Sequence, residues 1–160
     1  MKTTIRDFQS NDATAFLDIV RELQVFELEL YDRMMTPDQI GQWYIDELLN
    51  QCRVEDGSIL VAIRDGQLIG YATIFKKVEQ KGELDEVPFT YAFISHIAIL
   101  PVARGTGAGK LLLSECEKRA IEAGRKWLRI AVLAKNTIAR EIYQNIGFHD
   151  HHITMEKPLF

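Results

Sequence analysis

The spacing of apolar residues in the first third of the chain predicts a short strand followed by two helices. Residues 4–7 are typical of a strand, and a break is expected at 28–32. Between them, apolar residues recur every three or four positions, which is the spacing of a buried helix face: Phe16, Ile19, Val20 and Leu23. A second helix is expected to begin with Thr36 as its N-cap and Pro37 at its first position, and to continue to Gln51.

The middle of the chain has the alternation typical of strands. Residues 58–64 and 68–76 flank Asp65-Gly66, a strong signal for a hairpin turn. The polar and acidic stretch 78–88 indicates a loop. Residues 89–100 form a long β-rich run that ends before a proline.

The last third predicts two further units of helix and strand. Helices are expected over 107–123 and 137–145, and strands over 127–132 and 148–157. The resulting order is β-α-α-β-β-β-α-β-α-β. It predicts an α/β fold of the α+β kind, in which helices pack on a mixed sheet within one domain spanning residues 1–160.

Composition and charge narrow the function classes. Hydrophobic residues make up 47% and charged residues 26% of the 160 residues, which is enough apolar material for one core. The formal net charge is −4. Nucleic acid is therefore not expected as a partner, because phosphate neutralisation needs clustered Lys and Arg.

The cysteines and the first residues indicate a reducing, cytoplasmic setting. Cys52 and Cys116 have neither the spacing of metal ligands nor that of a disulfide framework. The N-terminal residues lack an apolar signal region, and no apolar run has transmembrane length, so no membrane partner is expected.

The histidines near the end of the chain do not predict a metal site. His149, Asp150, His151 and His152 lie on the expected last strand, where neighbouring residues point to opposite faces. At most His149 and His151 then share a face, and no second set of ligands accompanies them.

The densest chemical signal is a glycine loop between a predicted strand and a predicted helix. Gly105, Gly107 and Gly109 allow positive φ and close approach of a ligand to the backbone. A helix N-terminus adds unpaired N–H groups and partial positive charge, and Arg104 and Lys110 flank the loop with two cations. These features together suit a phosphate-bearing ligand.

Two common nucleotide-binding patterns do not fit this loop. The pattern G-x-x-x-x-G-K followed by Ser or Thr fails, since Leu111 follows Lys110 and Arg104 stands where the first glycine is required. The pattern G-x-G-x-x-G starting at Gly105 ends on Lys110. A tight turn without a ligand is the alternative interpretation of the loop.

Two motifs give this sequence a resemblance to the GNAT family, the Gcn5-related N-acetyltransferases. The acetyl-CoA loop of that family begins with Arg or Gln, continues x-x-G-x and ends with Gly or Ala, as residues 104–109 do after the strand-like stretch 97–101. The second motif, N-x-x-A-x-x-x-Y-x-x-x-G-F, is matched at every fixed position: Asn136, Ala139, Tyr143, Gly147 and Phe148. The resemblance covers nearly the whole chain.

The resemblance implies a fold and an activity. The fold is a GNAT domain with a central sheet of about six to seven strands and about four helices. The activity is the transfer of an acetyl group from acetyl-CoA to a primary amine by direct attack, without a metal. The residues implied to bind the cofactor are Ile97, Ala98, Ile99, Arg104, Gly105, Thr106, Gly107, Ala108, Gly109, Lys110, Asn136, Ala139 and Tyr143. In the family, backbone groups at the end of the fourth strand, here Ile97 and Ile99, face the pantetheine arm and the thioester.

The resemblance also assigns roles to two residues of the second motif. Tyr143 corresponds to the general acid that protonates the coenzyme A sulfur, and its alternative role is packing. Asn136 corresponds to a residue that binds near the pantetheine arm, and its alternative role is the N-cap of the following helix.

The general base is where this sequence departs from the family. Many members carry Glu or Asp on the fourth strand, whereas this chain has Ser95-His96. His96 has a suitable intrinsic pKa for a base acting directly or through water. Strand alternation predicts that Ser95 and His96 point to opposite faces. The alternative for His96 is a hydrogen-bonded histidine beneath the sheet.

Two acidic regions bear on the acceptor. The resemblance places both beside the acceptor, where they would attract a cationic amine such as a polyamine, an aminoglycoside or a basic peptide terminus. Their acidic residues are Glu27, Glu29, Asp32, Glu79, Glu83, Asp85 and Glu86. Ordinary solvated loops are the alternative. A non-catalytic acyl-CoA-binding or sensing module is the alternative function, and the resemblance also allows a homodimer.

Overall fold

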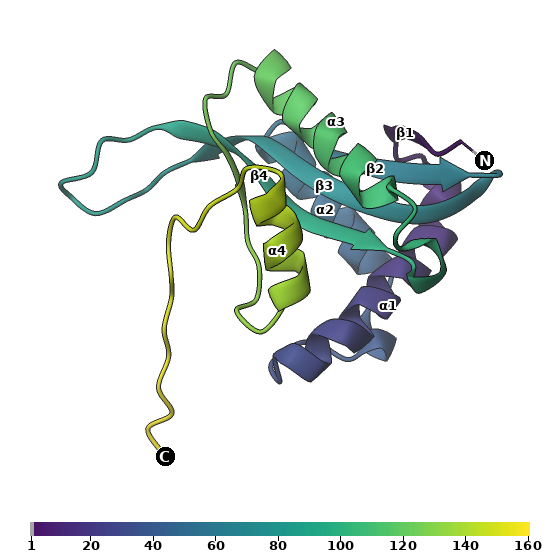
Figure 1. Cartoon of the computed structure of the whole chain (residues 1–160), viewed down its shortest axis with the longest axis horizontal. Helices are drawn as coiled ribbons and strands as arrows, with labels where there is room; N and C mark the ends of the chain where they lie inside the picture. The colour runs from purple at the N-terminus through teal and green to yellow at the C-terminus, as the bar shows by residue number, and fades with distance from the viewer. Residues whose placement is uncertain (1) are drawn as a thin grey trace.

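A mixed sheet of five strands forms the centre of the molecule (Figure 1), which we describe for residues 2–160 of a computed structural model. The strands lie side by side in the order in which the chain makes them, and the first four are antiparallel while β5 runs parallel to β4. Their bounds are β1 Thr4–Asp7, β2 Gly57–Arg64, β3 Gln67–Glu79, β4 Thr90–Ile99 and β5 Leu128–Ile130. The predicted fold class is confirmed.

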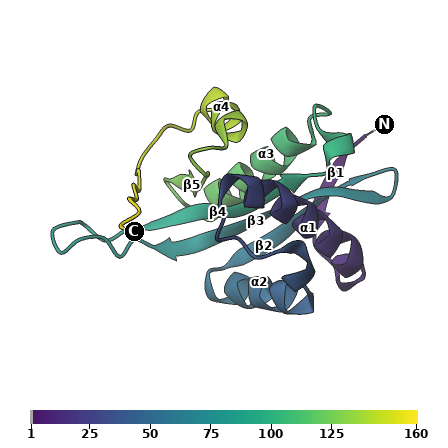
Figure 2. The ribbon, with the colours of Figure 1, turned by 90° about the horizontal axis from the view of Figure 1, so that it is seen from below.

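Four helices cover the two faces of this sheet, as predicted. Figure 2 shows one pair on each face: α1 (Ala13–Leu30) and α2 (Gln42–Val54) lie on one, and α3 (Ala108–Glu122) and α4 (Thr137–Asn145) lie on the other.

Each face of the sheet has its own buried core. On the first face, Phe16, Ile19 and Val20 of α1 pack against Tyr71 of β3. On the second, α3 packs its apolar face onto β2, β3 and β4 through Leu112, Leu113, Cys116 and Ala120. The helical spacing in the sequence therefore marked the side of α1 that the fold buries.

The hairpin between β2 and β3 forms as the sequence predicts. Asp65 and Gly66 both have positive φ, 51° and 77°. Two successive positive φ values match the twist of the flanking strands, which explains why Asp-Gly occupies the turn.

The segment before α2 differs from the expected single helix. Pro37–Gln39 forms a short 3-10 turn, and the Gln39 side chain accepts a hydrogen bond of 2.9 Å from the Thr36 N–H. Gly41 is extended, so the helix begins only at Gln42. Helix α1, in turn, continues into the break expected at 28–32 and ends at Leu30.

The predictions of a last strand over 148–157 and of six to seven strands were wrong. Among the described residues nothing after Phe148 has strand structure, and Figure 1 shows the segment as an extended arm beyond α4. Ile153 and Met155 are 71% and 89% exposed. Alternating apolar residues form a strand only against a partner, and this arm lies away from the sheet. It is tied instead by polar contacts, including one of 2.6 Å from Arg33 to Glu156.

No helix within residues 2–160 is both long enough and apolar enough to cross a bilayer.

Strand β4 packs so closely against β3 at Gly70 that a side chain there would clash. A Cβ built there would lie 2.4 Å from Ile99 Cδ1 and 2.7 Å from the Ala98 carbonyl oxygen. We expect Gly70→Ala to lower the free energy of unfolding by about 1–3 kcal/mol, since the backbone must shift, as measured by urea denaturation. Gly41→Ala is the control, because its Cβ would meet Trp43 Cδ1 at an ordinary 3.7 Å. Equal effects of the two variants would contradict a steric constraint at Gly70.

Candidate functional site

Strands β4 and β5 pair over a very short length and then separate. The ladder joins Ala92, Phe93 and Ile94 of β4 to Leu128, Arg129 and Ile130 of β5. From Ser95 to Ile99, β4 has a partner strand only on its β3 side among the described residues. The edge of β4 facing β5 is therefore open.

Backbone donors point into this opening. The Leu100 N–H donates to the Ile69 carbonyl oxygen at 2.9 Å, so it points towards β3. Successive N–H groups of a strand alternate in direction. The N–H groups of Ile97 and Ile99 consequently point away from β3, into the gap, whereas the Ala98 side chain is buried against the α1 side of the sheet.

A β-bulge at Ser95 changes the faces of the residues around it. Thr73 pairs with His96 and the next residue, Ile74, pairs with Ile94, so Ser95 is the extra residue of β4. Ile94 belongs to the core under α3, whereas His96 lies on the face covered by α1 and α2. The prediction that Ser95 and His96 point to opposite faces was wrong, because a bulge interrupts the alternation. Ser95 Oγ lies 3.0 Å from His96 Nδ1.

The glycine loop leads directly from the end of β4 into α3. Gly105 and Gly107 have φ of 73° and 86°, values that favour glycine. The first helical hydrogen bond runs from the Leu111 N–H to the Gly107 carbonyl oxygen at 3.1 Å. Within the described chain, the N–H groups of residues 108–110 have no backbone acceptor, as expected for a first helical turn.

The surroundings of the loop are open and positively charged. A Cβ placed on Gly105 or Gly107 would meet no atom within 4 Å. Thr106 Oγ1 donates to the Ala103 carbonyl oxygen at 2.6 Å and so holds the turn. Arg104 and Lys110 are exposed, and neither forms an ion pair within residues 2–160. This combination of free N–H groups, open space and two cations fits a pyrophosphate.

Helix α4 brings the second sequence motif to the same region. Asn136 caps the helix, since its Oδ1 accepts a hydrogen bond of 3.2 Å from the Ala139 N–H. Tyr143 is partly buried, and it packs with Ile97 and Ile99 against the core under α3. Burial, assisted by the charge of Glu27, raises the pKa of Tyr143 to about 12, so its hydroxyl is protonated at neutral pH.

A pocket of about 250 Å³ opens on the α1 side of β4. It lies between α1, the segment before α2, the start of α2 and His96. Burial lowers the pKa of His96, which is therefore neutral at pH 7, and its ring packs edge-on to Tyr44 with centroids 6.0 Å apart. The pocket is lined by Val20, Leu23, Gln24, Glu27, Arg33, Met34, Met35, Ile40, Trp43, Tyr44 and His96.

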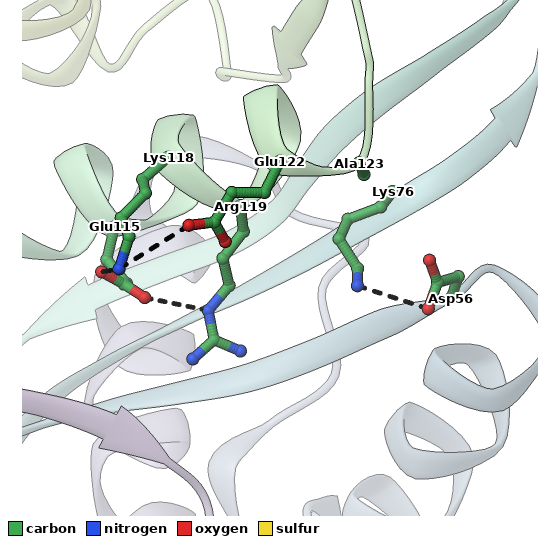
Figure 3. A pocket seen from close by; sticks show the side chains of 7 residues that line it. All are labelled: Asp56, Lys76, Glu115, Lys118, Arg119, Glu122 and Ala123. Carbon is green, nitrogen blue, oxygen red and sulfur yellow. Dashed lines mark hydrogen bonds and ion pairs between the residues drawn. The ribbon is translucent and has the colours of Figure 1, made fainter.

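A larger hollow of about 400 Å³ lies elsewhere, between α3 and β3 (Figure 3). Its charges neutralise one another: Lys76 pairs with Asp56 at 3.3 Å, and Arg119 pairs with Glu115 at 3.0 Å. Arg119 also binds Asp7 of β1 at 2.7 Å. This ion-pair network joins α3 to the sheet and contains none of the predicted site residues, so we assign it a structural role.

No group of three or more His, Cys, Asp and Glu side chains within residues 2–160 is arranged to hold a metal ion. Of the histidines near the end of the chain, His151 lies beside β5, where its Nε2 is 2.8 Å from an Arg129 nitrogen.

A sheet that opens beside a glycine loop at a helix N-terminus defines the class of acyl-CoA-dependent transferases, and comparison with known proteins gives the family. The acetyltransferase (GNAT) family model matches residues 18–148. The chain belongs to the GNAT family and is an acetyl-CoA-dependent N-acetyltransferase.

Relatives agree with this assignment. The ribosomal protein bS18-alanine N-acetyltransferase of Haemophilus influenzae is 31% identical over 134 residues, covering 84% of this chain and 83% of that protein. A tetramutant of the BH1408 protein from Bacillus halodurans has the same fold, with a TM-score of 0.82 and 19% identity over 98% of this chain and 99% of that one. AAC(6')-Iy, in complex with the bisubstrate analogue CoA-S-monomethyl-acetylneamine, also has this fold. Its TM-score is 0.73, and it is 16% identical over 99% of both chains.

The structure also singles out Tyr44 and Tyr71, which the sequence did not assign, and gives a position to Glu27, one of the acidic residues expected beside the acceptor. Tyr44 of α2 and Glu27 of α1 line the pocket, and Tyr71 of β3 is fully buried beside Tyr44. A sequence signal exists for Glu27: it extends the inward spacing of Phe16, Val20 and Leu23. A carboxylate at a position where the pattern calls for an apolar residue is the mark of a functional site.

Proposed function

We propose that this N-acetyltransferase holds acetyl-CoA between the glycine loop and the gap beside β4, and acetylates a primary amine that enters from the pocket at His96. The observation that carries this proposal is the open edge of β4, where the Ile97 and Ile99 N–H groups point into a gap next to the N-terminus of α3. The amine attacks the thioester directly, so no acetylated side chain is required.

Donor binding rests on the backbone of residues 105–110. Their N–H groups bind the pyrophosphate, and Arg104 and Lys110 add charge from two sides. Asn136 and Ala139 at the start of α4, with the backbone of 97–99, border the pantetheine arm. The side-chain Oδ1 of Asn136 accepts the capping hydrogen bond of α4, so the side-chain NH₂ group is the part that faces the ligand.

Acetyl transfer places negative charge on the thioester carbonyl oxygen. The Ile97 and Ile99 N–H groups are fixed by β4, and they stabilise this charge without having to reorganise. Removal of one such donor in other enzymes costs about 2.7–4 kcal/mol. The side chains of Ile97 and Ile99 are free for packing, because the chemistry uses the backbone.

Tyr143 supplies a proton to the departing sulfur. Its raised pKa keeps the hydroxyl protonated, yet a hydroxyl of that pKa would not by itself protonate a thiolate whose conjugate acid has a pKa of about 8.5. After attack the amine nitrogen is positively charged. Its proton replaces the one that Tyr143 gives to sulfur, so Tyr143 relays a proton between the two.

Before attack, His96 takes a proton from the ammonium form of the acceptor, directly or through water, so that the free amine is the nucleophile. The lowered pKa means that the imidazole is unprotonated and ready to act at pH 7. Ser95 Oγ, at 3.0 Å from Nδ1, fixes the ring and leaves Nε2 for this role. Residues 1–160 act as one N-acetyltransferase domain, and the acceptor is a small cationic amine or a peptide amine.

The activity is tested by incubating the protein with acetyl-CoA and a panel of primary amines while free thiol is measured. We expect thiol release to depend on the amine and on its concentration. Binding of acetyl-CoA without release above hydrolysis, across the whole panel, would support a non-catalytic acyl-CoA-binding module instead.

Tyr143→Phe should lower kcat by about a hundredfold, the lower end for a lost proton donor, because it removes the hydroxyl and keeps the ring that packs on Phe148. Acetyl-CoA affinity, measured by isothermal titration calorimetry, should stay within about twofold, since the ring remains. Tyr91→Phe on β4 is the matched control. An unchanged kcat in Tyr143→Phe would remove this hydroxyl from the mechanism.

Two substitutions at Gly107 separate ligand contact from backbone strain. Asn tolerates positive φ, so Gly107→Asn should retain most of the affinity for coenzyme A. Gly107→Trp should bind coenzyme A at least about tenfold more weakly than Gly107→Asn, a difference of about 1.4 kcal/mol. Calorimetric titration with coenzyme A measures both, and circular dichroism checks folding. If folded Gly107→Trp binds coenzyme A as well as Gly107→Asn does, the pyrophosphate is held elsewhere.

A further inference from the structure

Glu27 carries an uncompensated charge into the wall of the pocket. It lies on the inward side of α1 and is partly buried. Within residues 2–160 its carboxylate forms neither an ion pair nor a side-chain hydrogen bond, although other acidic groups on α1 and β1 find arginine partners. A carboxylate that loses water without gaining a donor costs stability, so its retention calls for a ligand.

The groups around Glu27 do not neutralise it. Its charge acts on hydroxyls from three other elements: Tyr44 of α2, Tyr71 of β3 and Tyr143 of α4, each of which has a raised pKa and stays uncharged. Tyr44 and Tyr71 face each other, but no hydrogen bond of ordinary geometry joins them. The Tyr71 hydroxyl is fully buried without a partner in the described chain.

The charged groups that share the pocket are already occupied or neutral. Arg33 lines it from the segment before α2, but its guanidinium binds Glu156 at 2.6 Å. His96 of β4 is neutral at pH 7. Glu27 is therefore the one net charge facing the pocket among its lining residues.

Most of the remaining wall is apolar and aromatic. Val20 and Leu23 of α1, Met34 and Met35, and Trp43 of α2 line the pocket with Glu27. Such a wall favours an apolar stem, and it offers no second carboxylate for a second cation.

We propose that Glu27 binds the ammonium group of the acceptor, and that the acceptor carries one positive charge on an apolar stem. This inference rests on the proposed function and names the substrate class of the same site. A small aralkylamine and the N-terminus of a peptide beginning with an apolar residue share this chemistry. A polyamine carries further positive charges, and binding here would desolvate them against apolar walls.

The position of Glu27 agrees with a role in placing the nitrogen. Its charge reaches Tyr143, which belongs to the donor side, and it shares the pocket with His96. An ammonium bound at Glu27 would therefore share the pocket with the proton acceptor His96. Glu27 supplies affinity, whereas His96 supplies proton removal, so the two residues should affect different kinetic constants.

Burial of the Glu27 carboxylate lowers the stability of the free enzyme, and this loss of stability can be measured as a second test. Burial raises its pKa above that of the unfolded chain. The penalty is absent at pH values below the unfolded pKa and develops as pH rises through the folded pKa. We expect Glu27→Gln to have a higher Tm than the unmodified protein at pH 8, with the difference disappearing at low pH.

The kinetic test uses Glu27→Gln, with Glu22→Gln, at an exposed position of α1, as the matched control. The probes are 2-phenylethylamine, a C-terminally amidated tripeptide beginning with Met, and spermidine, each assayed by thiol release. Glu27→Gln should raise KM for the preferred monocationic amine at least about tenfold and change kcat much less, because the loss is in binding. His96→Gln should instead lower kcat. Acetyl-CoA affinity should be unchanged in both glutamate variants.

The outcomes separate this proposal from the proposed function. If the unmodified protein turns over none of the amines, the proposed function fails, and calorimetric binding of 2-phenylethylamine to the two glutamate variants still tests Glu27. If turnover is normal and KM in Glu27→Gln equals that in Glu22→Gln, Glu27 does not bind the ammonium. Preference for spermidine would overturn the single-charge class. A lower Tm at pH 8 in Glu27→Gln would indicate a structural role.

Discussion

The separation of β4 from β5 is the constraint on which the site depends. Three residue pairs hold the two strands together, and beyond Ile94 they diverge. In a fully paired sheet the N–H groups of Ile97 and Ile99 would be used in a ladder, and the glycine loop would lead onto a closed surface. Because the strands part, one gap contains free backbone donors, lies next to the N-terminus of α3, and is bordered by α4. The β-bulge at Ser95 occurs where pairing with β5 stops, and it turns His96 to the acceptor side.

In the proposed mechanism, the charges of the site assign the donor and the acceptor to opposite faces of the sheet. The donor side has two exposed cations and a helix N-terminus, as suits a pyrophosphate. The acceptor side has one ionised carboxylate among apolar walls, as suits a cation. The groups between them, Tyr143 and His96, are both uncharged at neutral pH, for opposite reasons: burial raises the pKa of the phenol and lowers that of the imidazole. Burial thus prepares one group to donate and the other to accept.

Much of this arrangement could be predicted from the sequence, where local rules determine the outcome. Asp65-Gly66 demanded a hairpin, the alternating glycines marked the loop, and the spacing of Asn136 and Tyr143 placed both on one helix. Features that depend on a distant partner could not be predicted. Residues 148–157 alternate like a strand, but no strand accepts them. The bulge at Ser95 has no signature in its own residues, since it arises from the register with β3. Glu27 could be named from the sequence among several acidic residues, but its place in the pocket wall required the fold.

The shortest α-helix among the described residues, α4, bears on how the large donor could exchange. Helix α4 has nine residues, too few to persist alone in water, and it is held by the Asn136 cap and by packing of Tyr143 and Phe148. It follows a strand joined by three residue pairs, so few contacts must break for it to open. Local opening there costs less free energy than unfolding of the sheet. Transient fraying of α4 would therefore uncover the proposed donor side while β1 to β4 stay paired.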